Sequence, residues 1–289
     1  MNMKATILSF LVISGMLATG AIAQSPAFSE YKTLPVNGIN MAYRDIGSGP
    51  ALILLHGFSG TGAKWDPFLE DLSTKFHLIV PDLRGHGRSI NPSGHFTHQE
   101  LAQDVFNLLD QLGIDSFSAI GTSMGAMTLL HAATQQRERI NAMVLVGGSS
   151  YLPESARAFY RRSSPDSIPP ERLRVMATRH SGGEEQVLQL MRQFYSYRDS
   201  YDDVNFTKPY LASIKTSTLI VQGDRDQFFP VTIALELYNA IPNSYLWVVP
   251  NSRHSAGLRT TEGRKIFTDT VLDFLDGNWE QSTTSGARN

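Results

Sequence analysis

Short apolar segments alternate with amphipathic helical patterns along most of this 289-residue chain. The apolar segments are partly β-branched and are bounded by Gly, Pro or polar residues, which is typical of strands buried on both faces of a sheet. They are residues 51–55, 77–80, 117–120, 142–146, 218–221 and 245–249. Strand–helix alternation predicts an α/β fold, with a mostly parallel sheet of about eight strands flanked by helices.

An antiparallel pair of strands is expected at the start of the fold. Asn37-Gly38 separates the apolar runs 34–36 and 39–43, and this dipeptide accepts the positive φ angles of a tight hairpin. Helical patterns, with apolar residues three or four positions apart, cover residues 101–112, 127–134 and 266–275. Each pattern gives one apolar face, so we expect these helices to cover the sheet.

The composition excludes several classes of function. The 25 Lys and Arg residues against 27 Asp and Glu give a formal net charge of −2, which provides no electrostatic footprint for a nucleic acid. The 42% share of hydrophobic residues is too high for a disordered chain. Because there is no cysteine, disulfides, thiolate-bound metals and a thiol nucleophile are excluded. We therefore expect no nucleic-acid partner, and chemistry carried by other side chains.

The first 23 residues have the pattern of a secretory signal peptide. Lys4 supplies the positive charge, residues 5–18 form an uncharged apolar run, and Ala21-Ile22-Ala23 provides the small residues of a cleavage site. The run is shorter than the ~20 apolar residues of a spanning helix, so we expect no membrane anchor. The sequence thus predicts cleavage near Ala23 and export to the periplasm or the medium.

Residues 151–212 interrupt the alternation. They contain no convincing apolar strand, several prolines and nine of the 28 aromatic residues. So much aromatic area needs a surface to pack against, which predicts a helical cap over the carboxyl-terminal edge of the sheet. The nine Lys and Arg of this segment nearly balance its eight acids, so composition alone does not argue for an anionic substrate. The predicted organisation is a core of residues 24–150 and 213–276, the cap 151–212, and a disordered tail 277–289.

The pentapeptide Gly121-Thr122-Ser123-Met124-Gly125 lies between a predicted strand and a predicted helix. A serine on such a sharp turn has its hydroxyl lifted clear of the backbone, and crowding at the turn demands glycine two residues to either side. The N-terminus of the helix then points toward the same hydroxyl. This placement predicts that Ser123 is a catalytic nucleophile.

A serine hydroxyl needs a base in order to attack, and the base needs a carboxylate to orient it. His254 lies just after the last predicted strand, at the edge of the sheet where Ser123 is expected. Asp224 and Asp226 both follow the preceding strand, and periodicity alone does not choose between them, although we favour Asp226. The order Ser, Asp, His is the one expected of this architecture.

The other histidines have simpler interpretations. We expect hydrogen-bonding, packing or surface roles for His56 and His77 at strand ends, His131 on a helix, His95 and His98 in a polar loop, and His180 in the cap.

An acyl-transfer site also needs donors for the negative charge that develops on the substrate oxygen. The N–H of Met124, at the start of the helix that follows Ser123, is one candidate. The loop 56–60 is the other source, because its glycines let the backbone approach a substrate. Within that loop we select the N–H of Phe58.

Taken together, these residues resemble the α/β-hydrolase superfamily, in its serine-nucleophile branch with a helical cap. The resemblance extends over residues 31–275 and includes the block Pro81-Asp82-Leu83-Arg84-Gly85-His86-Gly87-Arg88-Ser89. In the superfamily this block is a structural loop. The resemblance therefore implies scaffold roles for Arg84 and His86, and no metal site.

The same resemblance bears on the candidate site. The family pattern Gly-x-x-Asp-x-x-x-Pro matches the chain from Gly223 to Pro230 with Asp226 at the acid position. His254 matches the family histidine, and Phe58 and Met124 match the oxyanion positions. Haloalkane dehalogenases and epoxide hydrolases of this superfamily use an aspartate at the turn, so a serine there disfavours their reactions.

Together with the resemblance, these residues predict a serine hydrolase that acts on small carboxylic esters through a Ser-His-Asp triad and an acyl-enzyme intermediate, with no cofactor and no metal. Two alternatives stay open. One is hydrolysis of carbon–carbon bonds in ring-fission products, which is less favoured because Ser255, and not an aromatic residue, follows His254. The other is a ligand-sensing protein that retains the triad and hydrolyses slowly. No feature of the sequence indicates an oligomeric state.

Overall fold

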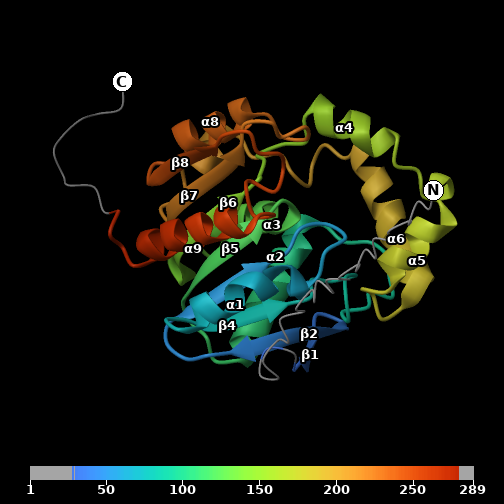
Figure 1. The fold of residues 1–289 in the computed structure, drawn as a ribbon, viewed down its shortest axis with the longest axis horizontal. Coiled ribbons are helices and arrows are strands. Elements are labelled where there is room, and N and C mark those ends of the chain that lie inside the picture. The colour runs from blue at the N-terminus through green and yellow to red at the C-terminus, as the bar shows by residue number, and fades with distance from the viewer. Residues whose placement is uncertain (1–27, 29, 280–289) are drawn as a thin grey trace, which may run out of the picture.

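A computed structural model of the chain describes residue 28 and residues 30–279, and its centre is one twisted sheet (Figure 1). The strands are β1 (Lys32–Val36), β2 (Ile39–Ile46), β3 (Ala51–Leu55), β4 (His77–Pro81), β5 (Phe117–Thr122), β6 (Ile140–Val146), β7 (Ser217–Gly223) and β8 (Ser244–Val249). Their order across the sheet is β1-β2-β4-β3-β5-β6-β7-β8. β2 runs antiparallel to β1 and β4, while the strands from β4 to β8 are parallel. The predicted eight-stranded, mostly parallel sheet is confirmed.

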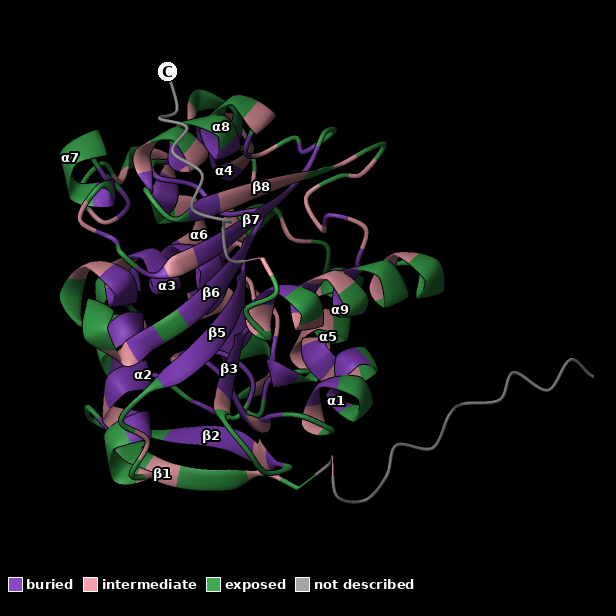
Figure 2. Ribbon diagram, turned by 90° about the vertical axis from the view of Figure 1, so that its left-hand side faces the viewer, coloured by how far each residue is buried: buried purple, intermediate pink, exposed green. Residues whose placement is uncertain are grey.

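Helices cover both faces of this sheet, as Figure 2 shows for α2 and α3 on one face and α1 and α9 on the other. The helices are α1 (Asp66–Ser73), α2 (His98–Gln111), α3 (Met124–Gln135), α4 (Glu154–Arg161), α5 (Pro170–Ala177), α6 (Gly183–Ser196), α7 (Lys208–Leu211), α8 (Val231–Ala240) and α9 (Thr261–Leu275). Helices α1 and α8 lie in segments where no helix was predicted.

The double coverage explains why the central strands contain continuous apolar runs and are not apolar only at every second position. In β3, Ile53 and Leu55 belong to the apolar core on the side of α2 and α3, whereas Leu52 and Leu54 belong to the core on the side of α1 and α9. All four side chains are fully buried. Alternate residues therefore serve different cores, and the strand has no face left for polar residues.

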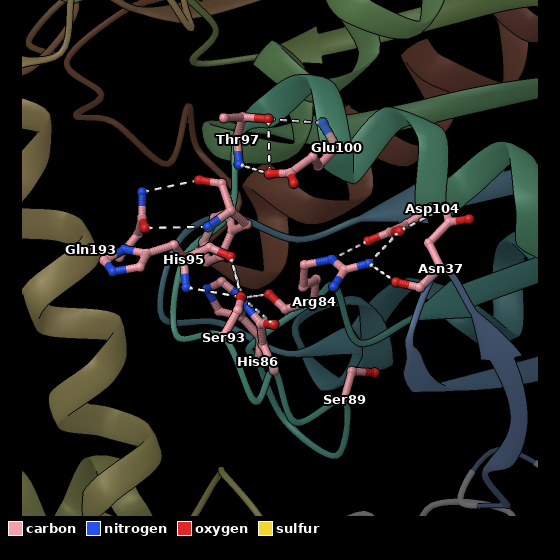
Figure 3. A network of polar contacts seen from close by, with 12 residues as sticks. Asn37, Arg84, His86, Ser89, Ser93, His95, Thr97, Glu100, Asp104 and Gln193 are labelled. Carbon is pink, nitrogen blue, oxygen red and sulfur yellow. Dashed lines mark hydrogen bonds and ion pairs between the residues drawn. The ribbon is translucent and has the colours of Figure 1, made fainter.

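Helix α2 begins three residues before the predicted apolar pattern, and this corrects the placement of His98. The Thr97 hydroxyl accepts from the Glu100 N–H, and the Glu100 carboxylate accepts from the Thr97 N–H at 2.7 Å (Figure 3). This capping box starts the helix at His98, which is buried, not part of a polar loop. The His98 ring lies 2.6 Å from the Asp203 carboxylate, so it joins the core to the segment that precedes β7.

Helices α4, α5, α6 and α7 all lie between β6 and β7, which confirms a helical cap inserted into the α/β core. The two ends of this insertion meet, because Tyr151 and Asn205 form an antiparallel bridge and the Phe206 N–H donates to the Ser150 carbonyl at 2.8 Å. Gln193 on α6 reaches the loop that follows β4 (Figure 3). The cap is thus fastened both at its ends and along α6.

Two sequence predictions concern the chain ends. The predicted signal peptide, residues 1–23, lies outside the described residues, as do residues 280–289 of the predicted tail. The first three residues of that tail, 277–279, are not disordered, because the Trp279 ring packs edge-on against Tyr245 and Phe274, with centroids 5.4 and 5.7 Å apart. Over the part of the chain that the structure covers, no helix has both the length and the apolar character needed to cross a membrane.

Candidate active site

Ser123 lies on a one-residue turn between β5, which ends at Thr122, and α3, which begins at Met124. Its backbone has φ 53° and ψ −113°, a conformation that costs a non-glycine residue energy and that other contacts must hold in place. One such contact is the hydrogen bond from the Ser123 N–H to the carbonyl of Val146 at the end of β6, at 2.8 Å. Two parallel strands therefore position the turn.

The glycines on either side of Ser123 are required by close approach of the backbone. A Cβ atom on Gly121 would lie 2.5 Å from the carbonyl carbon of Gly125, and a Cβ atom on Gly125 would lie 2.6 Å from the carbonyl oxygen of Leu55. Any side chain at these positions would push α3 away from the sheet. The spacing of the Gly-x-Ser-x-Gly motif thus reflects the packing of the turn against its own helix and against β3.

His254 and Asp226 lie on the loops after β8 and β7, and these two strands are paired. The Nδ1 atom of His254 is 2.7 Å from Oδ2 of Asp226. The Asp226 side chain is fully buried, and it also accepts from the Gln222 amide at 2.8 Å and from the Phe228 N–H at 2.8 Å. These donors fix the position of the Asp226 carboxylate. As an anion, it is a strong hydrogen-bond acceptor for the His254 imidazole.

Asp224, the other acid on the same loop, is placed differently. Its side chain accepts from the Ser252 N–H at 3.0 Å and lies 3.5 Å from the Arg225 guanidinium. It is exposed, and its hydrogen bond ties the β7–α8 loop to the β8–α9 loop. Of the two acids that sequence periodicity left open, the structure brings Asp226 to His254.

The N–H groups of Phe58 and Met124 are free for a ligand. Neither donates to another group within residues 30–279. Met124 is the first residue of α3, where the helix leaves its initial N–H groups without internal acceptors. Phe58 lies in the loop after β3, next to Gly57, whose own Cβ position would be 3.3 Å from the Ser123 side chain. The two loops are therefore in contact at the predicted nucleophile.

A cavity of about 590 Å³ joins these parts. Ser123, His254 and Phe58 line it, so the structure brings these predicted site residues to one space, with Asp226 behind His254. Its further walls are aromatic and come from the cap and the β7–α8 loop: Phe159, Tyr160, Phe194, Phe228 and Phe229. The Phe228 ring meets the His254 ring edge-on, with centroids 4.9 Å apart. This chamber thus combines aromatic walls with the polar side chains of Ser123 and His254.

Three buried histidines lie beside this chamber and hold the loops around it. The N–H of Leu83 donates to Nε2 of His56 at 2.9 Å, and the N–H of Gly87 donates to Nδ1 of His180 at 2.9 Å. A ring nitrogen that accepts carries no proton, so both rings are neutral in this arrangement. Burial lowers the pKa of His56 to about 4, and it lowers the pKa of His86 and of His180 as well.

These histidines predict a stability that depends on pH. Because their pKa values lie below the ordinary 6.5, the unfolded chain binds more protons than the folded one as the pH falls below about 6.5. We expect the free energy of unfolding to decrease from pH 6.5 to pH 4, with His56 alone contributing about 3 kcal/mol. Urea unfolding at a series of pH values measures this, and the decrease should be smaller in His180→Gln. A free energy that is constant between pH 6.5 and 5 would contradict it.

The loop that follows β4 contains the predicted scaffold residues. Arg84 forms a two-pronged ion pair with Asp104 on α2, at 2.7 and 2.8 Å, and donates to the Asn37 carbonyl (Figure 3). His86 is fully buried. Within the described ranges, no group of three or more His, Asp or Glu side chains could hold a metal ion. The geometry of Arg84 therefore ties the loop to the core.

Sequence reasoning missed some residues of the site. The Gln222 amide donates a hydrogen bond to Asp226, but nothing in the local sequence distinguishes this glutamine from any other at the end of a strand. Lys64 and several cap side chains line the cavity, although they are distant from the motifs along the chain. Only the fold brings such residues to Ser123.

Comparison with known proteins adds independent information. A family model described as alpha/beta hydrolase fold matches residues 50–175. Epoxide hydrolase 2 of Siraitia grosvenorii is 39% identical over 118 residues, but the match spans only 37% of that protein and 40% of this chain.

Two relatives match over most of their length. Serine hydrolase BPHL of Mus musculus is 29% identical over 252 residues, which cover 83% of this chain and 84% of that protein. The 2-hydroxy-6-oxononadienedioate/2-hydroxy-6-oxononatrienedioate hydrolase 2 of Pseudomonas putida is 28% identical over 267 residues, covering 82% of this chain and 92% of that protein.

Solved structures share the fold at lower identity. A membrane phospholipase A superposes with a TM-score of 0.72 at 21% identity, covering 88% of both chains. A thermophilic esterase from Thermogutta terrifontis superposes with a TM-score of 0.69 at 21% identity, covering 86% of this chain and 99% of that one. The sheet order, the inserted cap, the family match over residues 50–175 and these neighbours agree, and the chain has the α/β-hydrolase fold.

Proposed function

We propose that this hydrolase cleaves carboxylic esters through an acyl-enzyme formed on Ser123. The observation that carries the proposal is that Ser123, on its strained turn, shares one cavity with His254, whose Nδ1 atom is held 2.7 Å from the buried Asp226 carboxylate. A serine, an imidazole and a carboxylate in this relation are the parts that nucleophilic acyl transfer needs.

The proposed reaction has two halves. Nε2 of His254 takes the hydroxyl proton of Ser123 as Oγ attacks the acyl carbon, and Asp226 stabilises the imidazolium that forms. The N–H groups of Phe58 and Met124 bind the oxyanion. His254 then gives its proton to the departing alcohol. In the second half it takes a proton from the water that attacks the acyl carbon, and it returns this proton to Oγ of Ser123 as the acid departs. These residues supply the whole reaction without a cofactor.

The test is covalent labelling combined with turnover. A fluorophosphonate should add one phosphonyl group per chain, and peptide mapping should locate it on Ser123. 4-Nitrophenyl butyrate in large excess should be hydrolysed at a steady rate over many turnovers. A single burst without steady turnover would indicate a ligand-sensing protein, and labelling at another residue would refute the assigned nucleophile.

A second candidate is hydrolysis of a carbon–carbon bond. The observation that favours it is the match with the Pseudomonas putida hydrolase over 92% of that protein. A vinylogous 2-hydroxy-6-oxo-dienoate, assayed beside 4-nitrophenyl butyrate, separates the two reactions. A kcat/KM for the dienoate far above that for the ester would reverse the preference for ester hydrolysis.

A further inference from the structure

The cavity at Ser123 has an unbalanced set of charges. Four cationic side chains line it: Lys64, Arg162, Arg172 and Arg179. None of the described residues that line it is an aspartate or a glutamate. The chain as a whole has a formal charge of −2, so a local excess of positive charge at this cavity is a property of the fold and not of the composition.

The cap arginines divide into two groups by their partners. Arg161, Arg174, Arg192 and Arg198 each pair with a carboxylate, and Arg157 donates to backbone carbonyls. The remaining three are Arg162, Arg172 and Arg179, and their guanidinium groups have no ion pair or hydrogen bond within residues 30–279. The cap arginines without a partner are thus the ones that line the cavity.

Neighbours in sequence make this contrast sharp. Arg161 pairs with Glu154 away from the cavity, whereas Arg162, at the C-terminal end of α4, faces it. On α5, Arg174 lies 3.7 Å from Glu171, whereas Arg172 lines the cavity. Glu154 and Glu171 therefore pair with arginines that do not line the cavity.

Lys64 extends the positive charge toward the floor of the cavity. It lies in the short 3₁₀-helix η2 (Gly62–Trp65), which follows the loop that carries Phe58. Lys64 is partly buried and forms no ion pair with any residue in the described part of the chain. Burial lowers the pKa of Lys64, and the positive charge of Arg259 lowers it further. An anionic ligand would relieve both effects.

We infer that the preferred esters carry an anionic group, such as a carboxylate, on the part of the molecule remote from the scissile carbonyl. This inference rests on the proposed ester hydrolysis for the position of the reacting carbonyl at Ser123. The aromatic walls would hold an apolar middle section, while Arg162, Arg172, Arg179 and Lys64 would attract and orient the anion. The guanidinium groups at the mouth are exposed, so their attraction is sensitive to salt.

The test compares two substrates that differ in one charge. Mono-4-nitrophenyl adipate has a free carboxylate, and its methyl ester has the same chain without the charge; nitrophenol release reports the same bond in both. We expect kcat/KM to be about tenfold higher for the anion at low ionic strength, and the ratio to fall toward one in 0.5 M NaCl.

Matched variants distinguish the effect of the cavity arginines on this preference from the effect of the net charge of the protein. Arg162→Gln/Arg172→Gln should remove most of the preference for the anion, whereas Arg161→Gln/Arg174→Gln, with the same change in net charge on the same two helices, should keep it. Equal rates for the two esters with the wild type, or an equal loss of preference in both double variants, would overturn the inference.

A binding measurement tests the anion site separately from the proposed ester hydrolysis. Calorimetry with adipate and with hexyl phosphate requires no turnover and shows which type of anion binds. Binding of either one that is lost in Arg162→Gln/Arg172→Gln and kept in the control supports the anion site even where neither ester is hydrolysed. Binding of neither overturns it.

Discussion

Ser123→Ala is expected to lower kcat for 4-nitrophenyl butyrate by about 10⁴-fold or more, because the group that forms the acyl-enzyme is gone. The fold should be unaffected, since alanine accepts the same backbone turn as serine and removes only one hydroxyl. Initial rates measured at saturating ester, together with the thermal unfolding midpoint, check both statements. Fluorophosphonate labelling should disappear in the same variant.

A second serine on the same strand provides the control. Ser118 lies near the start of β5, where it pairs with Leu52 on β3, and it does not line the cavity. Ser118→Ala should keep kcat within about threefold of the wild type, because the substitution is distant from the reacting groups. If Ser123→Ala retained a tenth or more of the activity, Ser123 would not be the nucleophile.

Asp226→Asn is expected to lower kcat by about 10⁴-fold through the tautomer of His254. The carboxylate accepts from His254 and Gln222 through Oδ2, and from the Phe228 N–H through Oδ1. An asparagine amide that keeps its oxygen on the backbone N–H turns its NH₂ group toward His254. The imidazole must then accept at Nδ1 and carry its proton on Nε2, where it cannot take the proton of Ser123.

Gln222 sets the structural cost of this substitution. Its amide N–H groups donate to Oδ2 of Asp226 at 2.8 Å and to the Phe229 carbonyl at 2.7 Å, so a flipped Gln222 could accept from the new asparagine only by losing the bond to Phe229. We therefore expect a folded, inactive protein that is less stable than the wild type, measured by steady-state kinetics and by urea unfolding. The control is Asp224→Asn, an exposed residue of the same loop, which should change kcat less than about threefold. The reverse ranking would make Asp224 the functional acid.

The sheet could be predicted from the sequence because its strands have a strong local signal. β3 is apolar throughout and β6 is apolar from Ala142 to Val146, and the glycines around Ser123 mark a turn whose crowding permits no other residue. These features follow from contacts that every chain of this architecture must make. The positions of β3 to β8 and of α2, α3 and α9 were therefore found within a few residues.

Features that depend on distant partners could not be predicted. The residues around His98 in the sequence do not indicate that it is buried. Its environment is set by Asp203, which lies 105 residues further along the chain. The choice of Asp226 over Asp224 needed either a family resemblance or the fold, because both acids follow the same strand. The positive lining of the cavity could not be predicted from composition either. Composition does not distinguish Arg162 from Arg174, although only Arg174 has a carboxylate partner.

The bridge between Tyr151 and Asn205 has a consequence for how this protein could change over evolution. Because the inserted segment leaves and re-enters the core at adjacent points, its replacement by another segment need not move β6 or β7. Ser123, Asp226 and His254 all attach to the core, whereas the arginines at the cavity mouth belong to the insertion. Under the proposed function, exchange of this one segment would replace the arginines that select the substrate and leave the proposed catalytic residues in place, while Lys64 and Phe228 would keep the part of the cavity that the core supplies.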